Sequence, residues 1–194
     1  LGVVTGKPLS IGGSLGREEA TARGSLYVIA DALEEENKGL DGLRVAVQGF
    51  GNVGRHLARM LAEEGAIVVA VADSSGGLYA PKGLDLPLAL AHKAEHGTLS
   101  GFAGADAITN DELLALDCDV LAPCALEQVI HADNAGQVKA RIVCEGANGP
   151  VTPGADEILE DRGVLVLPDV LANAGGVVVS YFEWVQGLQE YFWK

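Results

Sequence analysis

The sequence predicts an α/β fold with a doubly wound, mostly parallel sheet that helices cover on both faces. Short apolar runs alternate along the chain with longer stretches whose apolar residues recur at helical spacing. The runs are apolar almost throughout, as expected of strands buried on both faces of a parallel sheet. The 194 residues fit one domain, which we expect to extend over residues 1–194.

The first half of the chain alternates three predicted helices with two predicted strands. The first helix has apolar residues at helical spacing and ends at Gly39, a C-cap. The other two helices end at Gly65 and Gly97. The helices are expected at residues 17–37, 52–64 and 85–96, and the strands at residues 43–48 and 66–72, the latter stopped by a turn at 73–77.

The second half continues this alternation and ends in a helix. Thr152 is an N-cap followed by Pro153 at the first helical position, and the pair opens a helix to about Arg162. After Gly176 there is no proline and only Gly187 interrupts the pattern, so we expect a C-terminal helix over residues 174–194. Strands are expected at residues 119–122, 141–144 and 164–167, and a short helix at residues 111–116.

Both ends of the chain indicate contacts outside it. Residues 1–14 contain a short apolar lead and a turn, as a hinge segment does. Six of the ten aromatic residues lie in the last fourteen positions: Tyr181, Phe182, Trp184, Tyr191, Phe192 and Trp193. A helix that is apolar on several faces needs partners, so we expect residues 174–194 to continue into or pack on a missing domain or another subunit. Ordinary core packing is the alternative.

The composition argues against several classes of protein. The chain carries 13 Lys+Arg against 27 Asp+Glu, and its net charge of −14 disfavours nucleic acid and anionic membranes as partners. The longest apolar stretch, residues 66–72, is too short for a membrane span. The three cysteines are odd in number and form no CxxC pair, and no leader opens the chain, so we expect reduced thiols in a cytoplasmic protein.

A glycine motif joins the first strand to the following helix. Gly49, Phe50, Gly51, Asn52, Val53 and Gly54 form a GxGxxG, a weak signal alone but a specific one between a strand and a helix. Gly49 allows the tight turn, Gly51 lets the backbone approach a pyrophosphate, and Gly54 lets the helix pack close to the sheet. We therefore predict a Rossmann-like dinucleotide-binding fold. A tight turn without a ligand is the alternative.

The second strand is followed by an acidic residue that bears on the choice of coenzyme. Asp73 stands 19 residues after Gly54, where a carboxylate can accept hydrogen bonds from a ribose diol and repel a 2′-phosphate. This favours NAD. Ser74, Ser75 and Gly76 are small enough to tolerate a phosphate, and the nearest following cation is Lys82, so NADP stays open.

The sequence gives no support to a metal site or to phosphoryl transfer. His92 and His96 are spaced for a metal, but the HExxH glutamate is absent, and we expect a solvated pair and no metal site. The sequence contains no P-loop lysine, so nothing indicates phosphoryl transfer.

Three segments resemble motifs of the glutamate dehydrogenase family of amino-acid dehydrogenases. Residues 12–21 are similar to its GGSxGRxEAT stretch, residues 145–150 match its EGANGP loop, and residues 168–184 resemble its PDxxxNAGGVxVSYFEW signature. The resemblance spans almost the whole chain. It implies a coenzyme domain inserted between parts of a second domain, in agreement with the hinge segment and the aromatic end.

The resemblance also implies residue roles. Asn52 and Val53 would contact the pyrophosphate through the glycine loop. The other roles are Thr21 at the nicotinamide carboxamide, Asp73 and Ser74 at the adenosine ribose, Ala125 under the dinucleotide near the nicotinamide-side ribose, Gly146, Asn148 and Asn173 at the nicotinamide end, and Ser180 at a carboxylate of glutamate. Ala22 and Cys124 depart from the family's usual residues but are small, and Cys124 is expected to be an inert thiol.

The function implied is the coenzyme domain of a glutamate dehydrogenase, which interconverts L-glutamate with 2-oxoglutarate and ammonia by hydride transfer. No lysine here lies in a matching catalytic motif, so we expect no catalytic residue in this chain, a missing substrate domain and a homo-oligomer, hexameric by resemblance. Two alternatives stay open: a parent acting on leucine, phenylalanine or valine, and a non-catalytic nucleotide-binding regulatory subunit.

Overall fold

The computed structural model describes residues 2–193, and within them the chain forms a seven-stranded sheet in the order β4-β3-β2-β1-β5-β6-β7. The strands that pair in parallel are β1 (Arg44–Gln48), β2 (Ile67–Asp73), β5 (Val120–Pro123), β6 (Ile142–Cys144) and β7 (Leu165–Leu167). The chain runs outward from β1 to β2 and then crosses back to β5 on the other side of β1. The predicted doubly wound, mostly parallel sheet is confirmed.

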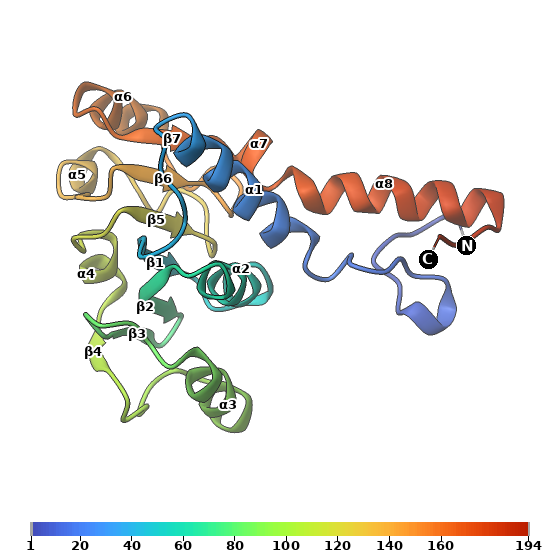
Figure 1. Ribbon diagram of the computed structural model, residues 1–194, viewed down its shortest axis with the longest axis horizontal. Coiled ribbons are helices and arrows are strands. Elements are labelled where there is room, and N and C mark those ends of the chain that lie inside the picture. Colours follow the sequence, from blue (N-terminus) through green and yellow to red (C-terminus); the bar gives the residue numbers. More distant parts are fainter. Residues whose placement is uncertain (1, 194) are drawn as a thin grey trace.

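Helices cover both faces of this sheet (Figure 1). One layer contains α1 (Ala20–Glu34), α2 (Asn52–Glu63) and α3 (Leu86–His96), and the other contains α4 (Asn110–Leu114), α5 (Ala132–Ala135) and α6 (Pro153–Asp161). Two short elements complete the chain: a 3₁₀ turn at Leu9–Ile11 and helix α7 (Asp169–Ala172), after which α8 (Ala174–Gln189) begins.

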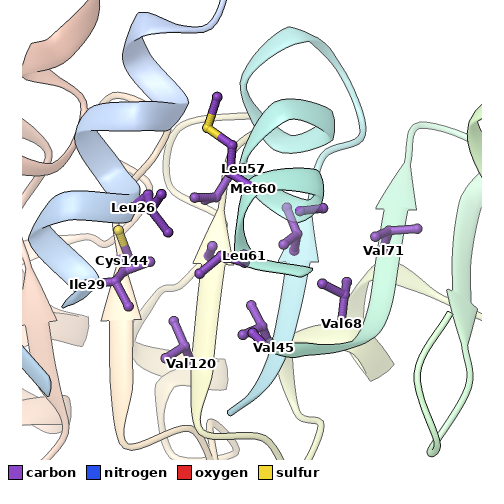
Figure 2. Packing of buried hydrophobic residues seen from close by; sticks show 14 of the residues in the cluster. Leu26, Ile29, Val45, Leu57, Met60, Leu61, Val68, Val71, Val120 and Cys144 are labelled. Carbon is purple, nitrogen blue, oxygen red and sulfur yellow. The ribbon is translucent and has the colours of Figure 1, made fainter. Parts of the chain in front are cut away.

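The central strands β1, β2, β5 and β6 are largely apolar and buried, because each of their faces meets a helical layer. In β1, Val45 and Val47 belong to the core under α1 and α2, whereas Ala46 between them belongs to the opposite core. Figure 2 shows the first core, in which Leu57 and Leu61 of α2 lie over the strand valines. Burial on both faces fixes the register, because a slip by one residue would exchange the two cores.

Two strands, β3 (Gly76–Tyr79) and β4 (Asp106–Ile108), were not predicted and add an antiparallel edge to the sheet. The predicted turn at 73–77 is wrong in its second half, because Gly76 and Gly77 pair with β2. A Cβ on Gly77 would lie 3.0 Å from Ile108 Cγ1 and 3.2 Å from Ala72 Cβ, so the glycine allows the neighbouring strands their close approach.

Helix α8 extends away from the sheet, with the N-terminal segment beside it (Figure 1). Glu183, fully buried on α8, accepts hydrogen bonds from the Gly6 backbone N–H at 2.9 Å and from Lys7 Nζ at 2.5 Å. Gln186 donates to Ser14 Oγ at 2.7 Å. These partly buried polar contacts fasten residues 6–14 to α8.

The C-terminal helix is shorter than the predicted range 174–194. It ends at Gln189 because Glu190 adopts a left-handed conformation (φ +53°) and donates its backbone N–H to Gln186 O. The chain then turns back, so that the Trp193 ring lies 5.5 Å from the Phe182 ring. Tyr181 and Trp184 stay 58% and 42% exposed. Lys194, the last residue of the predicted helix, lies outside the described residues.

Within residues 2–193, no helix combines the length and the apolar character that crossing a membrane requires.

Candidate functional site

The glycine turn after β1 is sterically closed to side chains at two positions. Gly49 has φ +100°, and a Cβ there would lie 2.8 Å from both Ala125 Cβ and Ala125 N. A Cβ on Gly54 would lie 1.7 Å from the Gly49 carbonyl oxygen. Glycine is therefore required at both positions, one for the turn and one for the contact of α2 with the loop.

Gly51 is different, because the space beside it is open. It adopts extended backbone geometry as the N-cap of α2, and a Cβ there would meet nothing within 4 Å. The first N–H groups of α2 lack intrahelical partners and favour an anion in this space. The Asn52 side chain instead donates to the Glu18 carbonyl at 2.8 Å. The backbone at this turn is therefore not covered by neighbouring side chains.

Asp73 ends β2 and is held by several donors. It accepts hydrogen bonds from the backbone N–H groups of Ser75 at 2.8 Å and Leu99 at 3.1 Å, and it forms an ion pair with Lys93. Burial alone raises the pKa of Asp73, but the hydrogen bonds from Lys93 and Ser75 outweigh it and hold the pKa below its ordinary value. The carboxylate is therefore ionised at neutral pH, beside an exposed Ser74.

Lys93 was missed by sequence reasoning. It lies on α3, 20 residues beyond Asp73, so no local pattern links the two. Packing of α3 against α2 brings it to the end of β2. Together with Phe50, Gly51, Asn52 and Arg55, Lys93 lines a cavity of about 380 Å³ in front of the glycine turn. Two cations therefore face this cavity.

A larger cavity, of about 850 Å³, lies beyond the ends of β5, β6 and β7. Its lining brings together residues from six segments of the chain. The predicted site residues among them are Thr21, Val53, Ala125, Gly146, Asn148, Asn173 and Ser180. Phe50, Gly51 and Asn52 line the smaller cavity instead. The other predicted residues, Gly49, Gly54, Asp73 and Ser74, line neither of these two cavities.

Arg17 is a second residue that sequence reasoning missed. Its Nε donates to Ser180 Oγ at 2.7 Å, and both side chains line the larger cavity. The contact is possible because α8 packs closely on α1: a Cβ on Gly176 would lie 2.2 Å from Thr21 Oγ1. Arg17 stands in the same GGSLGREEAT segment as Thr21. Its position, four residues before a predicted coenzyme-binding residue, was the sequence signal that could have identified it.

The loop after β6 forms another wall of the larger cavity. The Asn173 side-chain amide donates to Asn148 Oδ1 at 2.7 Å and to the Ala147 carbonyl at 3.2 Å. Gly146 packs on Cys124, whose Sγ would lie 2.5 Å from a Cβ at that position. Backbone carbonyls and amide side chains thus face the cavity from this side.

The thiols and histidines show no arrangement for catalysis or metal binding. Burial raises the pKa of Cys124 to about 12, as it does for Cys118, so neither thiol is activated. His92 and His96 stack at 4.3 Å between ring centroids. Among residues 2–193 there is no group of three or more potential metal-binding side chains.

The glutamate/leucine/phenylalanine/valine dehydrogenase family matches residues 12–194 of this sequence. A glutamate dehydrogenase of Thermotoga maritima is 57% identical over 196 aligned positions, which cover 100% of this chain and 47% of that protein. The chain belongs to this dehydrogenase family. The resemblance of its three motifs is confirmed.

Solved glutamate dehydrogenases share the fold. A hetero-hexameric glutamate dehydrogenase from Thermus thermophilus in a Leu-bound form superposes with a TM-score of 0.93 at 41% identity, covering 99% of this chain and 45% of that chain. The glutamate dehydrogenase from Peptoniphilus asaccharolyticus gives a TM-score of 0.80 at 37% identity, with 99% and 45% covered. The chain therefore spans about half the length of the relatives it matches.

Proposed function

We propose that this chain is the dinucleotide-binding part of a glutamate dehydrogenase. The observation that carries the proposal is the place where the strand order reverses. The chain leaves β1 for β2 on one side and returns to β5 on the other, and the turns after β1 and β5 touch at Gly49 and Ala125. Ligands of open α/β sheets bind at such a switch point, outside the carboxyl ends of the strands.

The two cavities suit the two ends of a dinucleotide. The pyrophosphate lies against the open backbone at Gly51 and the first N–H groups of α2. Asp73 accepts from the adenosine ribose. The nicotinamide end occupies the larger cavity, where Thr21, Asn148 and Asn173 supply hydrogen-bonding groups and Ala125 leaves room for the ring. When bound, the nicotinamide supplies the hydride acceptor or donor.

We infer that the coenzyme is NAD, with NADP as the second candidate. An ionised Asp73 favours a free ribose diol and repels a 2′-phosphate. Lys93, ion-paired with Asp73, offsets part of that repulsion and offers a cation that a phosphate can engage. The pair thus favours NAD while keeping NADP binding measurable.

The substrate carboxylate belongs beside Arg17 and Ser180. A guanidinium and a hydroxyl 2.7 Å apart at the rim of the larger cavity provide a charged and a neutral donor for one carboxylate. The reaction is L-glutamate, NAD⁺ and water to 2-oxoglutarate, ammonium, NADH and a proton, through an imine. Arg17 and Ser180 orient the substrate, and the group that moves protons lies in the other half of the protein, as does the rest of the substrate site.

An assay of the full-length protein tests this function. We expect oxidation of L-glutamate with NAD⁺ at a higher kcat/KM than that of leucine, valine or phenylalanine, and no turnover by residues 1–194 alone. Arg17→Met in the full-length protein raises KM for glutamate and leaves the affinity for NADH unchanged. A preference for leucine, valine or phenylalanine would instead favour a dehydrogenase of one of those amino acids. No turnover with any of them, by a full-length protein that binds dinucleotide, would favour a regulatory subunit.

The exposed aromatic side chains of α8 point to assembly contacts. Tyr181 and Trp184 have large exposed surfaces on an element that projects from the sheet (Figure 1). We propose that the rest of the polypeptide or another subunit covers them, in a homo-oligomer, and that the first fourteen residues act as a hinge.

A further inference from the structure

Glu145 is a nearly buried carboxylate that none of the roles above uses. It follows β6 directly, is 6% exposed, and stands one residue before the loop that lines the larger cavity. Its Oε1 accepts the backbone N–H of Val151 at 3.1 Å, and its Oε2 accepts the backbone N–H of Asp169 at 2.7 Å. Each oxygen therefore binds a different segment: the far end of its own loop, and the first turn of α7.

The two segments that Glu145 joins carry the cavity wall. Asp169, whose N–H it binds, accepts the Gly149 N–H at 2.8 Å through its own carboxylate. Four residues later, Asn173 donates to Asn148 Oδ1 at 2.7 Å. Glu145 thus closes the loop on itself. It also ties the loop to Asp169 of α7, and this contact is more buried than those that Gly149 makes with Asp169 and Asn148 makes with Asn173.

The ionised form of Glu145 is the one that fits these contacts. A carboxylate accepts both N–H groups, whereas a protonated carboxyl would set an O–H donor against one of them. The charged groups that face it are Asp169 from α7 and Asp156 from α6, both acidic. Burial, reinforced by these two acids, raises the pKa of Glu145 above its ordinary value of 4.5, although the two backbone N–H groups lower it.

We propose that Glu145 is a positioning residue that holds the 146–149 loop in its dinucleotide-binding geometry only while it is ionised, so that binding weakens as this carboxylate takes up a proton. The inference rests on the proposed function, because it concerns the nicotinamide end of the same cavity. It adds a proton-linked control of coenzyme affinity through a group that does not line the cavity.

The test is calorimetric titration of the chain with NAD⁺ between about pH 8 and about pH 5, the range in which folded domains are most stable. The affinity of the unaltered chain for NAD⁺ should fall as the pH is lowered, and the fall should begin above pH 4.5. Glu145→Gln places an amide N–H donor against one backbone N–H and so imitates the protonated form. It should bind about tenfold more weakly at the alkaline end, the effect of one lost hydrogen bond to a charged group, and its affinity should not change with pH.

Glu112→Gln is the matched control. Glu112 also accepts a backbone N–H, from Thr109 at 2.7 Å, but it is exposed and belongs to the capping box of α4. This variant should keep both the affinity and the pH profile. Glu145→Gln with an unchanged pH profile would overturn the proposal. If the unaltered chain binds no NAD⁺ at any pH, the proposed function fails instead, so the two failures are distinguishable.

A second pair of variants covers the case in which Glu145→Gln does not fold. Asp169 is the first residue of α7, where proline is accepted, and the preceding residue has the extended geometry that proline requires. Asp169→Pro removes both the N–H that Glu145 binds and the side chain, whereas Asp169→Ala removes the side chain alone. The proposal expects the proline variant to bind NAD⁺ more weakly and with a flatter pH profile. Equal NAD⁺ affinities and equal pH profiles of Asp169→Pro and Asp169→Ala would contradict the role proposed for Glu145.

Discussion

At the scale of single residues, the ion pair at the end of β2 lies where we propose that the coenzyme ribose binds. Asp73 is 8% exposed in its side chain and Lys93 26%, so the pair is partly shielded from water. Such a pair interacts more strongly than a surface salt bridge, and removing one partner leaves a charge whose desolvation is no longer compensated. The Asp73 carboxylate repels a 2′-phosphate, whereas the Lys93 ammonium attracts it.

Lys93→Ala should therefore change coenzyme preference. Without the lysine, the Asp73 carboxylate repels a 2′-phosphate more strongly, so the affinity for NADPH should fall by about tenfold while that for NADH changes little. Fluorescence titration with each reduced coenzyme measures the ratio. Lys82→Ala, which changes an exposed lysine outside the proposed site, is the control. An equal loss for both coenzymes would mean that Lys93 only supports the fold.

The residues that sequence reasoning identified and missed differ in a physical way. Gly49, Gly54 and Asp73 could be predicted because their roles depend on the local strand–turn–helix geometry. Lys93 and Arg17 could not be assigned, because their contacts with Asp73 and Ser180 arise from the packing of distant segments, 20 and 163 residues apart. Whether the predicted residues bind as expected stays a prediction.

At the scale of elements, α8 and the N-terminal segment form one unit through Glu183. Its carboxylate is fully buried and binds the Gly6 N–H and the Lys7 ammonium. Burial alone raises the pKa of Glu183, but Lys7 and the backbone donors outweigh it and lower the pKa below 4.5. The contribution of this group to the stability of the fold is therefore complete above that pH, and it is lost as the pH falls through the lowered pKa.

Glu183→Gln should detach the N-terminal segment from α8. The substitution leaves the Lys7 ammonium buried without its counter-charge, which costs about 3 kcal/mol in the free energy of unfolding. Denaturant unfolding measures the loss, and amide hydrogen exchange should rise at Gly6 and Lys7. Glu157→Gln, at an exposed position on α6, should leave the free energy of unfolding unchanged. Unaltered exchange at Gly6 in Glu183→Gln would contradict the role given to this contact.

The elements themselves were predictable where pattern and caps agree. The strands β1, β2, β5, β6 and β7 were predicted within one residue or two, because burial on both faces leaves them apolar. The strands β3 and β4 were missed, since Gly76 and Gly77 read as a turn and only the neighbouring strands make them a strand. The end of α8 at Gln189 was missed because nothing in the sequence marks Glu190 as left-handed.

At the scale of the whole molecule, the central claim is that the switch point between β1 and β5 binds a dinucleotide. The most direct test is titration of residues 1–194 with NADH, followed by nicotinamide fluorescence, in the unaltered chain and in Gly51→Val. A Cβ at position 51 meets nothing within 4 Å, so we expect Gly51→Val to fold, but its side chain covers the backbone that a pyrophosphate must approach. Gly136→Val, at another open position, is the control. We expect saturable NADH binding by the unaltered chain and the control, and an affinity lower by at least about tenfold in Gly51→Val, or about 1.4 kcal/mol. Equal binding by all three folded chains, or no binding by any, would contradict this claim.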